Sequence, residues 1–329
     1  MEQKSIMFCS AGRRAELLKD FRKSITEDYR IIATDLANIA PALYFADKGY
    51  LVPRIDDPKY IDTVLDICKK ENVKAITTLI DPEIEILAKN REKFSEIGVL
   101  VLTPGLETAQ ACFDKYKMFE VLKNHGIDTV ETFETFEQFE SANVEGKVDF
   151  PVFVKPRCGS GSVGAQKVTN KELLKNLCEG NPDLIIQEYM DGSDLDADIY
   201  VDAISHEAVS IFTKKKLETR IGGANKTISF KDEKLFEIVK NIVNQFEFYG
   251  PIDMDFFYKD GKYYMSEVNP RFGGAYLHAY GCGVDFVKLI MNNIEGIENK
   301  EQIGQYESDV VMMMYDSVVF CRSTELIEG

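Results

Sequence analysis

Short apolar runs alternate with amphipathic stretches over residues 1–110 of the chain. The runs predict buried strands. The stretches between them predict helices, because their apolar residues recur at three- and four-residue spacing. The predicted strands are 5–9, 31–34, 75–79 and 99–102, and the predicted helices are 15–25, 60–71 and 82–94. This alternation predicts a doubly wound α/β domain with a parallel sheet.

The remainder of the chain predicts an α+β organisation, because hairpin patterns and isolated helices replace the regular alternation. The predicted strands are 152–155, 163–169, 184–189, 195–204, 208–212, 252–258, 262–268 and 308–321. The predicted helices are 113–126, 171–178, 232–246 and 275–291, the last interrupted around 281–283. Residues 131–145 predict a polar connector with one short helix, and residues 213–226 a basic loop.

The stretch 252–274, IDMDFFYKDGKYYMSEVNPRFGG, predicts a β-hairpin with a turn at 259–261. Asp255 and Glu267 lie on opposite arms and can face one another if the loop is short and slightly irregular. Asn269 follows Glu267 by two residues, so both side chains share one face of the strand. Two carboxylates and an amide make an oxygen-only site of the kind that Mg²⁺ occupies together with substrate phosphates. The alternative is a surface hairpin with scattered solvated charges.

Arg271 lies two residues beyond Asn269 and offers a planar fork that matches a carboxylate or a phosphate. We expect Arg271 to orient a substrate carboxylate, for which the following glycines leave room. The alternative is a structural ion pair that holds the hairpin to the domain. Asp253 is an additional acid that either supports the metal site or competes with Asp255 for the role of ligand.

A glycine-rich loop within PVFVKPRCGSGSVG, residues 151–164, follows a predicted strand that carries Lys155. Its G-x-G-x-x-G pattern does not open a helix, and neither the later kinase motifs nor a G-x-x-x-x-G-K-[ST] motif occurs. We therefore expect a phosphate-covering flap, with a flexible hairpin tip as the alternative. The expected phosphate-covering residues are Gly159, Ser160, Gly161, Ser162, Val163 and Gly164.

Two further stretches predict contacts with an anion. Lys115 lies at the start of the predicted helix 113–126, where it is either a phosphate ligand or a solvated lysine. The basic segment TKKKLETRIGGANK, residues 213–226, suits a mobile loop that closes over phosphate or, equally, a solvated surface loop. The turn after the first strand, residues 10–14, lacks G-x-G-x-x-G, which argues against a dinucleotide-dependent dehydrogenase.

Composition and charge limit the classes of molecule that we expect this protein to bind. The chain has 329 residues and a net charge of −16, which disfavours nucleic acid as a partner. Its seven cysteines include no C-x-x-C pair, which predicts reduced thiols in a cytoplasmic protein and no structural zinc. No apolar run approaches the length of a membrane span, and the first residues show no signal-peptide pattern, so we expect no membrane partner.

These motifs, in this order, resemble the ATP-grasp superfamily, and in particular its carbamoyl-phosphate-synthase-like branch, which also holds many carboxylate–amine ligases. The shared order is a lysine at a helix start, V-K-P before a glycine loop, Q-E-Y-M, and then D…E-x-N-P-R. The resemblance implies an ATP-grasp fold after a pre-ATP-grasp α/β domain. The implied domains are 1–112, a small lid subdomain at 113–190, and a C-terminal subdomain at 191–329 that holds the metal and substrate sites.

The resemblance also implies roles for individual residues. Lys115 and Lys155 would bind the phosphates of ATP, and Asp194 its ribose. Arg220 and Lys226 would contact the transferred phosphoryl group. The residues implied to line the adenine are Gln187, Glu188, Tyr189 and Met190, where Gln187 replaces the usual glutamate of the family. The residues implied to hold Mg²⁺ or Mn²⁺ are Asp255, Glu267 and Asn269.

The function implied by the resemblance is an ADP-forming ligase that joins a small-molecule carboxylate, such as an amino acid, to an amine through an acyl phosphate. One alternative is phosphorylation of a small acid such as carbamate, which is disfavoured by the single ATP-grasp unit and the lack of a glutaminase domain. Another is a nucleotide-binding module without turnover, which the complete set of metal ligands disfavours. The sequence leaves open whether the protein is a homodimer.

Overall fold

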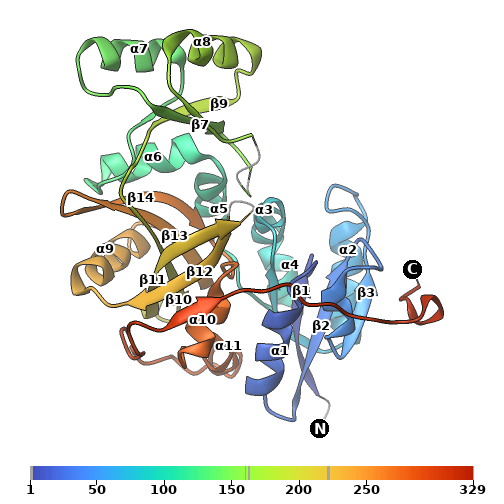
Figure 1. Cartoon of the computed structure of the whole chain (residues 1–329). Helices are drawn as coiled ribbons and strands as arrows, with labels where there is room; N and C mark the ends of the chain where they lie inside the picture. Colours follow the sequence, from blue (N-terminus) through green and yellow to red (C-terminus); the bar gives the residue numbers. More distant parts are fainter. Residues whose placement is uncertain (1–2, 160, 162–163, 221–222, 329) are drawn as a thin grey trace.

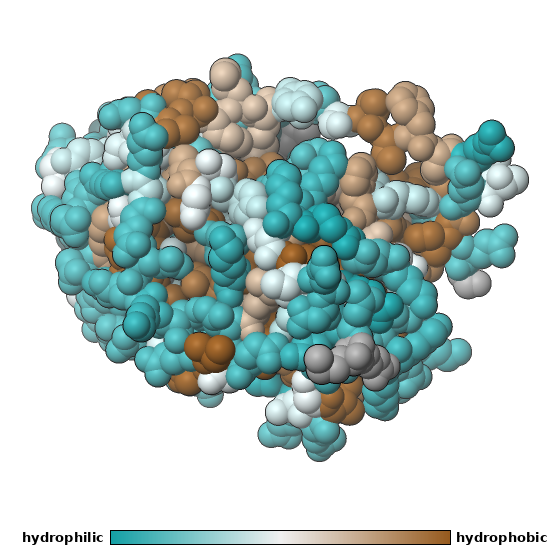
Figure 2. Space-filling view, turned by 90° about the horizontal axis from the view of Figure 1, so that it is seen from below, coloured by the Kyte–Doolittle hydropathy of each residue, from teal (hydrophilic) through white to brown (hydrophobic). Residues whose placement is uncertain are grey.

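The computed structural model describes residues 3–159, 161, 164–220 and 223–328. These residues form three sheets with flanking helices (Figure 1). Most side chains on the face shown in Figure 2 are hydrophilic, with apolar ones scattered among them. This distribution agrees with a chain in which 29% of the residues are charged. No helix in the described ranges is long and apolar enough to cross a membrane.

The N-terminal domain contains a five-stranded parallel sheet in the order β3-β2-β1-β4-β5. Its strands are β1 (Lys4–Cys9), β2 (Tyr29–Asp35), β3 (Lys48–Leu51), β4 (Val73–Thr78) and β5 (Leu100–Val101). Its helices are α1 (Ala15–Ser24), the 3₁₀ helix η1 (Pro41–Tyr44), α2 (Tyr60–Lys70), α3 (Asp81–Lys89), α4 (Arg91–Glu96) and α5 (Leu106–Phe113). The predicted doubly wound α/β domain is confirmed.

The small subdomain has its own apolar core, and its sheet and helices α7 and α8 project away from the C-terminal sheet (green, Figure 1). Its antiparallel sheet has the order β6-β9-β7-β8. The elements are α6 (Lys115–Asn124), β6 (Thr132–Phe133), α7 (Phe136–Val144), β7 (Val152–Pro156), β8 (Gln166–Val168), α8 (Lys171–Gly180) and β9 (Leu184–Glu188). Asp114 caps α6 by accepting hydrogen bonds from the backbone N–H groups of Tyr116 and Lys117.

The C-terminal subdomain is built on a six-stranded antiparallel sheet in the order β14-β13-β10-β11-β12-β15. Its strands are β10 (Ser193–Val201), β11 (Ala208–Arg220), β12 (Gly223–Phe230), β13 (Gly250–Lys259), β14 (Lys262–Asn269) and β15 (Val311–Met313). Its helices are α9 (Glu233–Val243), α10 (Tyr276–Gly281), α11 (Phe286–Ile294) and the 3₁₀ helix η2 (Ser323–Glu325). One apolar core joins this subdomain to the N-terminal domain. Within it the ring centres of Phe21 and Phe272 lie 5.5 Å apart.

Some predicted elements are wrong. Residues 213–226 do not form a loop: β11 and β12 are antiparallel strands that reach to Arg220 and start again at Gly223. The predicted helix 82–94 is divided at Asn90 into α3 and α4. Within the predicted strand 308–321, the regular strand is β15 alone, and the chain then crosses to the N-terminal domain. The predicted domain limits at residues 112 and 190 stay predictions.

Candidate functional site

The β13–β14 hairpin sets the geometry of the site. Its turn holds Asp260 at φ +50° and Gly261 at φ +79°, as a tight hairpin turn requires. In the register of the two strands Asp255 lies directly opposite Glu267. A register shift after Asp255 provides the irregularity that this pairing needs. The predicted meeting of the two carboxylates on one face is therefore confirmed.

A cavity of about 520 Å³ lies between the small subdomain and this hairpin. Its lining brings together residues predicted separately from distant parts of the sequence. They are Lys115, Lys155, Gly159, Asp194, Asp255 and Glu267. The cavity therefore presents cations from the small subdomain to carboxylates from the C-terminal sheet.

The two predicted lysines reach this cavity from separate elements. Lys115 is the first residue of α6, and its ammonium donates to the carbonyl of Gly159 and lies 3.6 Å from Glu267 Oε1. Lys155 is buried on β7. Burial lowers the pKa of Lys155, with Glu267 opposing the shift and Lys115 adding to it. Two neighbouring cations, one of them poorly solvated, favour binding of a polyanion such as a triphosphate.

Lys216, which the sequence analysis did not single out, is a third lysine of the cavity. Its ammonium lies 3.0 Å from Asp194 Oδ1 and also contacts Asp255 Oδ1. Burial acts to lower the pKa of Lys216, but the surrounding carboxylates, Asp255 foremost, raise it well above its usual value. Lys216 is therefore an ammonium ion that links the predicted ribose-binding acid to a predicted metal ligand. The prediction of a loop for residues 213–226 does not apply the period of two of a strand, which turns the Lys216 side chain toward the cavity.

The donor set fits a hard divalent cation. Asp255, Glu267 and Asn269 offer carboxylate and amide oxygens as ligands, and the Asn269 amide nitrogen lies 3.5 Å from Asp255 Oδ2. Such ligands suit Mg²⁺ or Mn²⁺. Burial and neighbouring acids raise the pKa of Asp255 to about 6, even though Lys216 opposes the shift. Because burial and neighbouring acids disfavour its charge, the Asp255 carboxylate is stabilised by a nearby cation. In this structure that cation is the Lys216 ammonium.

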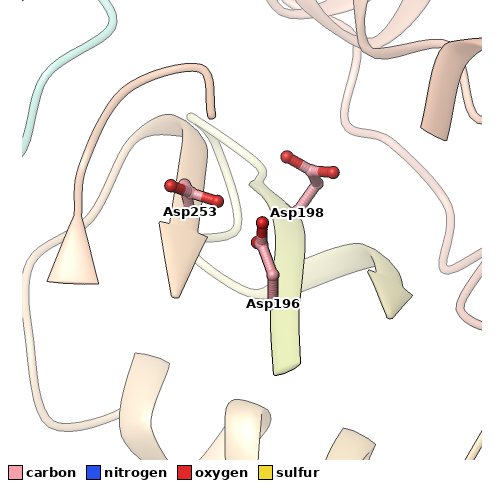
Figure 3. A group of neighbouring side chains, drawn as sticks. All are labelled: Asp196, Asp198 and Asp253. Carbon is pink, nitrogen blue, oxygen red and sulfur yellow. The ribbon is translucent and has the colours of Figure 1, made fainter. Parts of the chain in front are cut away.

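Beside these residues, on the same face of the sheet, lies a buried charge cluster of Asp196, Asp198, Asp253 and Lys214, whose acids are drawn in Figure 3. One oxygen from each of the three carboxylates lies within 4.8 Å of the others. The Lys214 ammonium lies 3.1 Å from Asp196 Oδ1 and also contacts Asp198. Burial and Asp196 raise the pKa of Asp253 well above its usual value. Asn269 Nδ2 lies 3.4 Å from Asp253 Oδ2 and 3.5 Å from Asp255 Oδ2, so the assignment of Asp255 as the metal ligand stays a prediction.

Arg271 turns from the hairpin toward the N-terminal domain. Its Nε lies 2.8 Å from Asp81 Oδ1 at the start of α3, and its Nη1 lies 3.9 Å from Asp253 Oδ2. Both members of the Arg271–Asp81 pair are largely buried, with side-chain exposures of 15% and 13%. The pair corresponds to the alternative in which Arg271 holds the hairpin to the neighbouring domain. The expected contact between Arg271 and a substrate carboxylate stays a prediction.

The residues predicted to line adenine follow one another at the end of β9. Gln187 is buried and donates from Nε2 to Thr132 Oγ1 at 2.8 Å, and Glu188 lies 3.8 Å from Lys259. The ammonium of Lys167 lies 3.8 Å from the ring centre of Tyr189, and Met190 is buried. Among the predicted flap residues, Ser160, Ser162 and Val163 lie outside the described residues.

The residues predicted to contact the transferred phosphoryl group lie on the β11–β12 hairpin. Arg220 is exposed and pairs with Asp316 at 3.0 Å, and Lys226 pairs with Glu218 at 2.8 Å. Neither residue lines the cavity, to which the hairpin contributes Lys216 and Thr219. The structure therefore does not bring Arg220 and Lys226 together with the metal-ligand set, and their role stays a prediction.

The cavity lies between two subdomains and is lined by lysines and by two facing carboxylates. This arrangement is typical of ATP-grasp proteins. A family model for the ATP-grasp domain matches residues 112–275, and a model described as PylC-like, N-terminal domain matches residues 6–102. The chain belongs to the ATP-grasp superfamily and carries a PylC-like N-terminal domain. The predicted family is confirmed.

Relatives in sequence and in structure agree with this assignment. The arginine-specific carbamoyl phosphate synthase large chain of Geobacillus stearothermophilus is 24% identical over 258 residues, covering 75% of this chain and 23% of that protein. The carbamoyl phosphate synthase large chain of Sulfurisphaera tokodaii is 26% identical over 255 residues, covering 73% of this chain and 23% of that protein. The chain thus spans about a quarter of the length of these curated relatives.

Two solved structures have the same fold. N5-carboxyaminoimidazole synthetase from Staphylococcus aureus, complexed with ADP, superimposes with a TM-score of 0.73 and 17% identity, covering 90% of this chain and 78% of that one. The L-amino acid ligase from Bacillus licheniformis superimposes with a TM-score of 0.65 and 17% identity, covering 91% and 75%.

Proposed function

We propose that the protein is an ADP-forming ligase that joins a small carboxylate, such as an amino acid, to an amine at the expense of ATP. One observation carries the proposal: the facing carboxylates of Asp255 and Glu267 and the ammonium groups of Lys115 and Lys155 line one cavity of about 520 Å³. A triphosphate with a bound Mg²⁺ needs this combination of cations and oxygen donors. Membership of the ATP-grasp superfamily supports the same reaction class.

Each part of the site then has a task. Lys115 and Lys155 bind the phosphates and neutralise their charge, while the loop that includes Gly159 and Gly161 covers them. Asp255, Glu267 and Asn269 would hold Mg²⁺ or Mn²⁺, which supplies charge neutralisation at the transferred phosphoryl group.

The chemistry proceeds in two balanced steps. A carboxylate oxygen of the substrate forms a bond to the γ-phosphorus as the bond from that phosphorus to the β–γ bridging oxygen breaks, so ADP leaves and an acyl phosphate forms. The nitrogen of a neutral amine then forms a bond to the acyl carbon as the bond from carbon to the phosphate oxygen breaks. Inorganic phosphate leaves, and the nitrogen releases one proton. We expect the Lys216 ammonium, which contacts Asp255 in the structure, to pair with a phosphate oxygen of bound nucleotide.

A second candidate function is phosphorylation of a small acid such as carbamate. It is favoured by one observation, namely that the relatives described above are carbamoyl phosphate synthase large chains. The two functions differ in their requirement for an amine, because phosphorylation of the acid ends with the acyl phosphate.

The test is a screen for ADP release across small carboxylates, each with and without a panel of amines, followed by measurement of the product mass. We expect a product whose mass equals acid plus amine minus one water, and hydroxylamine should trap the acyl phosphate as a hydroxamate. ADP release that needs carbamate and incorporates no amine would support the second candidate. Nucleotide binding without turnover on any acid would contradict both.

A further inference from the structure

A second cavity, of about 210 Å³, lies on the other side of Glu267, between β14 and the N-terminal domain. We call it the interdomain cavity. Its acidic lining residues are Asp81 and Glu85 on α3 and Glu267 on β14, and its apolar lining includes Ile84, Ala109 and Val268. By the measure in which one water needs roughly 10–15 Å³, the interdomain cavity has room for a small organic molecule.

The position of this cavity in the fold is that of a ligand site. In the order β3-β2-β1-β4-β5 the strand sequence reverses between β1 and β4, and α3 begins directly after β4 with Asp81. Open α/β sheets bind ligands in the crevice beyond the carboxyl ends of their strands at such a reversal. Here that crevice is closed on its far side by Glu267 and Asn269, so a ligand in it would lie beside the proposed site of phosphoryl transfer.

The charges around the cavity select the class of ligand. Of the described lining residues, three carry carboxylates and none carries a lysine, arginine or histidine side chain. Asp81 is paired with Arg271 at 2.8 Å, and Glu267 lies 3.6 Å from Lys115. Glu85 Oε1 accepts a hydrogen bond from a neutral group, the amide of Gln110, at 2.9 Å.

We infer that the interdomain cavity binds the amine substrate as an ammonium ion, with Glu85 as its counter-ion, and that this amine has a small apolar body without a carboxylate. The inference rests on the proposed function and specifies its second substrate. An ammonium group beside Glu85 gains a charge-assisted hydrogen bond, and alkyl groups contact Ile84, Ala109 and Val268. A carboxylate in the same cavity would face acids of its own sign without an unpaired cation.

The acyl phosphate and the amine would then meet from different sides of Glu267. The acyl phosphate forms in the large cavity, and the amine arrives from the N-terminal domain across Glu267. To attack, the ammonium must first lose a proton, for which the Glu85 carboxylate is the nearest acceptor in the proposed arrangement. The nitrogen lone pair then forms the C–N bond, phosphate leaves with the C–O bonding electrons, and the second proton leaves the nitrogen.

Binding to the full chain, measured by ligand-observed NMR without nucleotide, tests this inference independently of turnover. The probes share one branched apolar chain: 3-methylbutylamine, the neutral 3-methylbutanol, leucine and 4-methylpentanoate. We expect the amine to bind at least about tenfold more tightly than each of the other three. Glu85→Gln should weaken amine binding by about tenfold and leave the alcohol unchanged. The matched control Glu92→Gln, at an exposed position on α4, should change neither.

The inference is overturned if leucine or 4-methylpentanoate binds as tightly as the amine, if no probe amine binds at millimolar concentration, or if Glu85→Gln binds the amine like the wild type. The wild-type comparison decides the matter even if the variant fails to fold. The proposed function has a separate failure: absence of ADP release with every acid would contradict the ligase while leaving selective amine binding intact.

Discussion

Replacement of Lys214 by methionine tests whether the buried charge cluster holds the C-terminal sheet together. Lys214 is fully buried on β11, and its ammonium contacts Asp196 and Asp198. Methionine keeps much of the volume and removes the charge, which leaves buried carboxylates without their cation. Breaking a buried ion pair in this way costs about 3–5 kcal/mol, so we expect Lys214→Met to lower the free energy of unfolding by that amount at pH 8.

The cost should depend on pH and on Asp198. Burial raises the pKa of Asp198 to about 6 in the wild type, despite the opposing effect of Lys214, and removal of Lys214 raises it further. A carboxyl whose pKa is raised by folding stabilises the fold at low pH and loses that contribution as pH rises through the folded pKa. The defect of Lys214→Met should therefore shrink from pH 8 to pH 5, and Asp198→Asn should recover part of it.

Urea unfolding followed by circular dichroism at both pH values measures these differences. Lys215→Met is the matched control, because Lys215 neighbours Lys214 on β11 with its side chain exposed, and it should behave like the wild type. The reasoning is refuted if Lys214→Met lies within about 1 kcal/mol of the control at pH 8, far below the cost of breaking a buried pair. A defect that Asp198→Asn leaves unchanged at both pH values would refute it equally.

Three further predictions concern other parts of the molecule. Arg271→Lys should keep the affinity for ATP and lose most of kcat, because the charge survives and the bidentate fork does not. A stability loss above about 3 kcal/mol, with activity per folded molecule intact, would instead assign Arg271 to the ion pair with Asp81. Gly161→Val should raise the KM for ATP about tenfold, because Gly161 has φ +69° and a left-handed backbone costs other residues roughly 1–2 kcal/mol; an unchanged KM would contradict the flap. Burial, and to a smaller extent Lys214, lower the pKa of His278 to about 4, so folding becomes less favourable as pH falls from 6.5 toward 4. Over that range the free energy of unfolding of the wild type should fall by about 3 kcal/mol more than that of His278→Gln. Parallel pH profiles of the two proteins would refute this.

The β13–β14 hairpin could be predicted from the sequence because its information is local. The period of two along a strand places Glu267 and Asn269 on one face, and the short turn sets the register that brings Asp255 opposite. The strand–helix alternation of the first 110 residues likewise predicts the parallel sheet, since each element repeats its own apolar period.

The lysines of β11 could not be predicted as buried. A run of charged residues with nearby glycines has the composition of a loop. Lys214 is buried and Lys216 is mostly buried because acids on β10 and β13 pair with them. Those pairs depend on the order of strands in the sheet, which a pattern along one segment does not contain. The contact of Arg271 with Asp81 joins two domains, and the acidic lining of the interdomain cavity depends on the same docking.

The central claim is that Glu267, with Asp255 and Asn269, holds the metal that ATP needs, and Glu267→Gln tests it most directly. The substitution keeps shape and removes one charge. The measurements are Mn²⁺ binding in the presence of ATP, by electron paramagnetic resonance, and the rate of ADP formation. The control is Glu298→Gln, at an exposed position beyond α11.

We expect Glu267→Gln to unfold at the same temperature as the wild type, to bind Mn²⁺·ATP much more weakly and to form no measurable ADP, while the control matches the wild type in all three. ADP formation within about threefold of the wild-type rate, a difference below 1 kcal/mol in the activation free energy, would contradict the metal site.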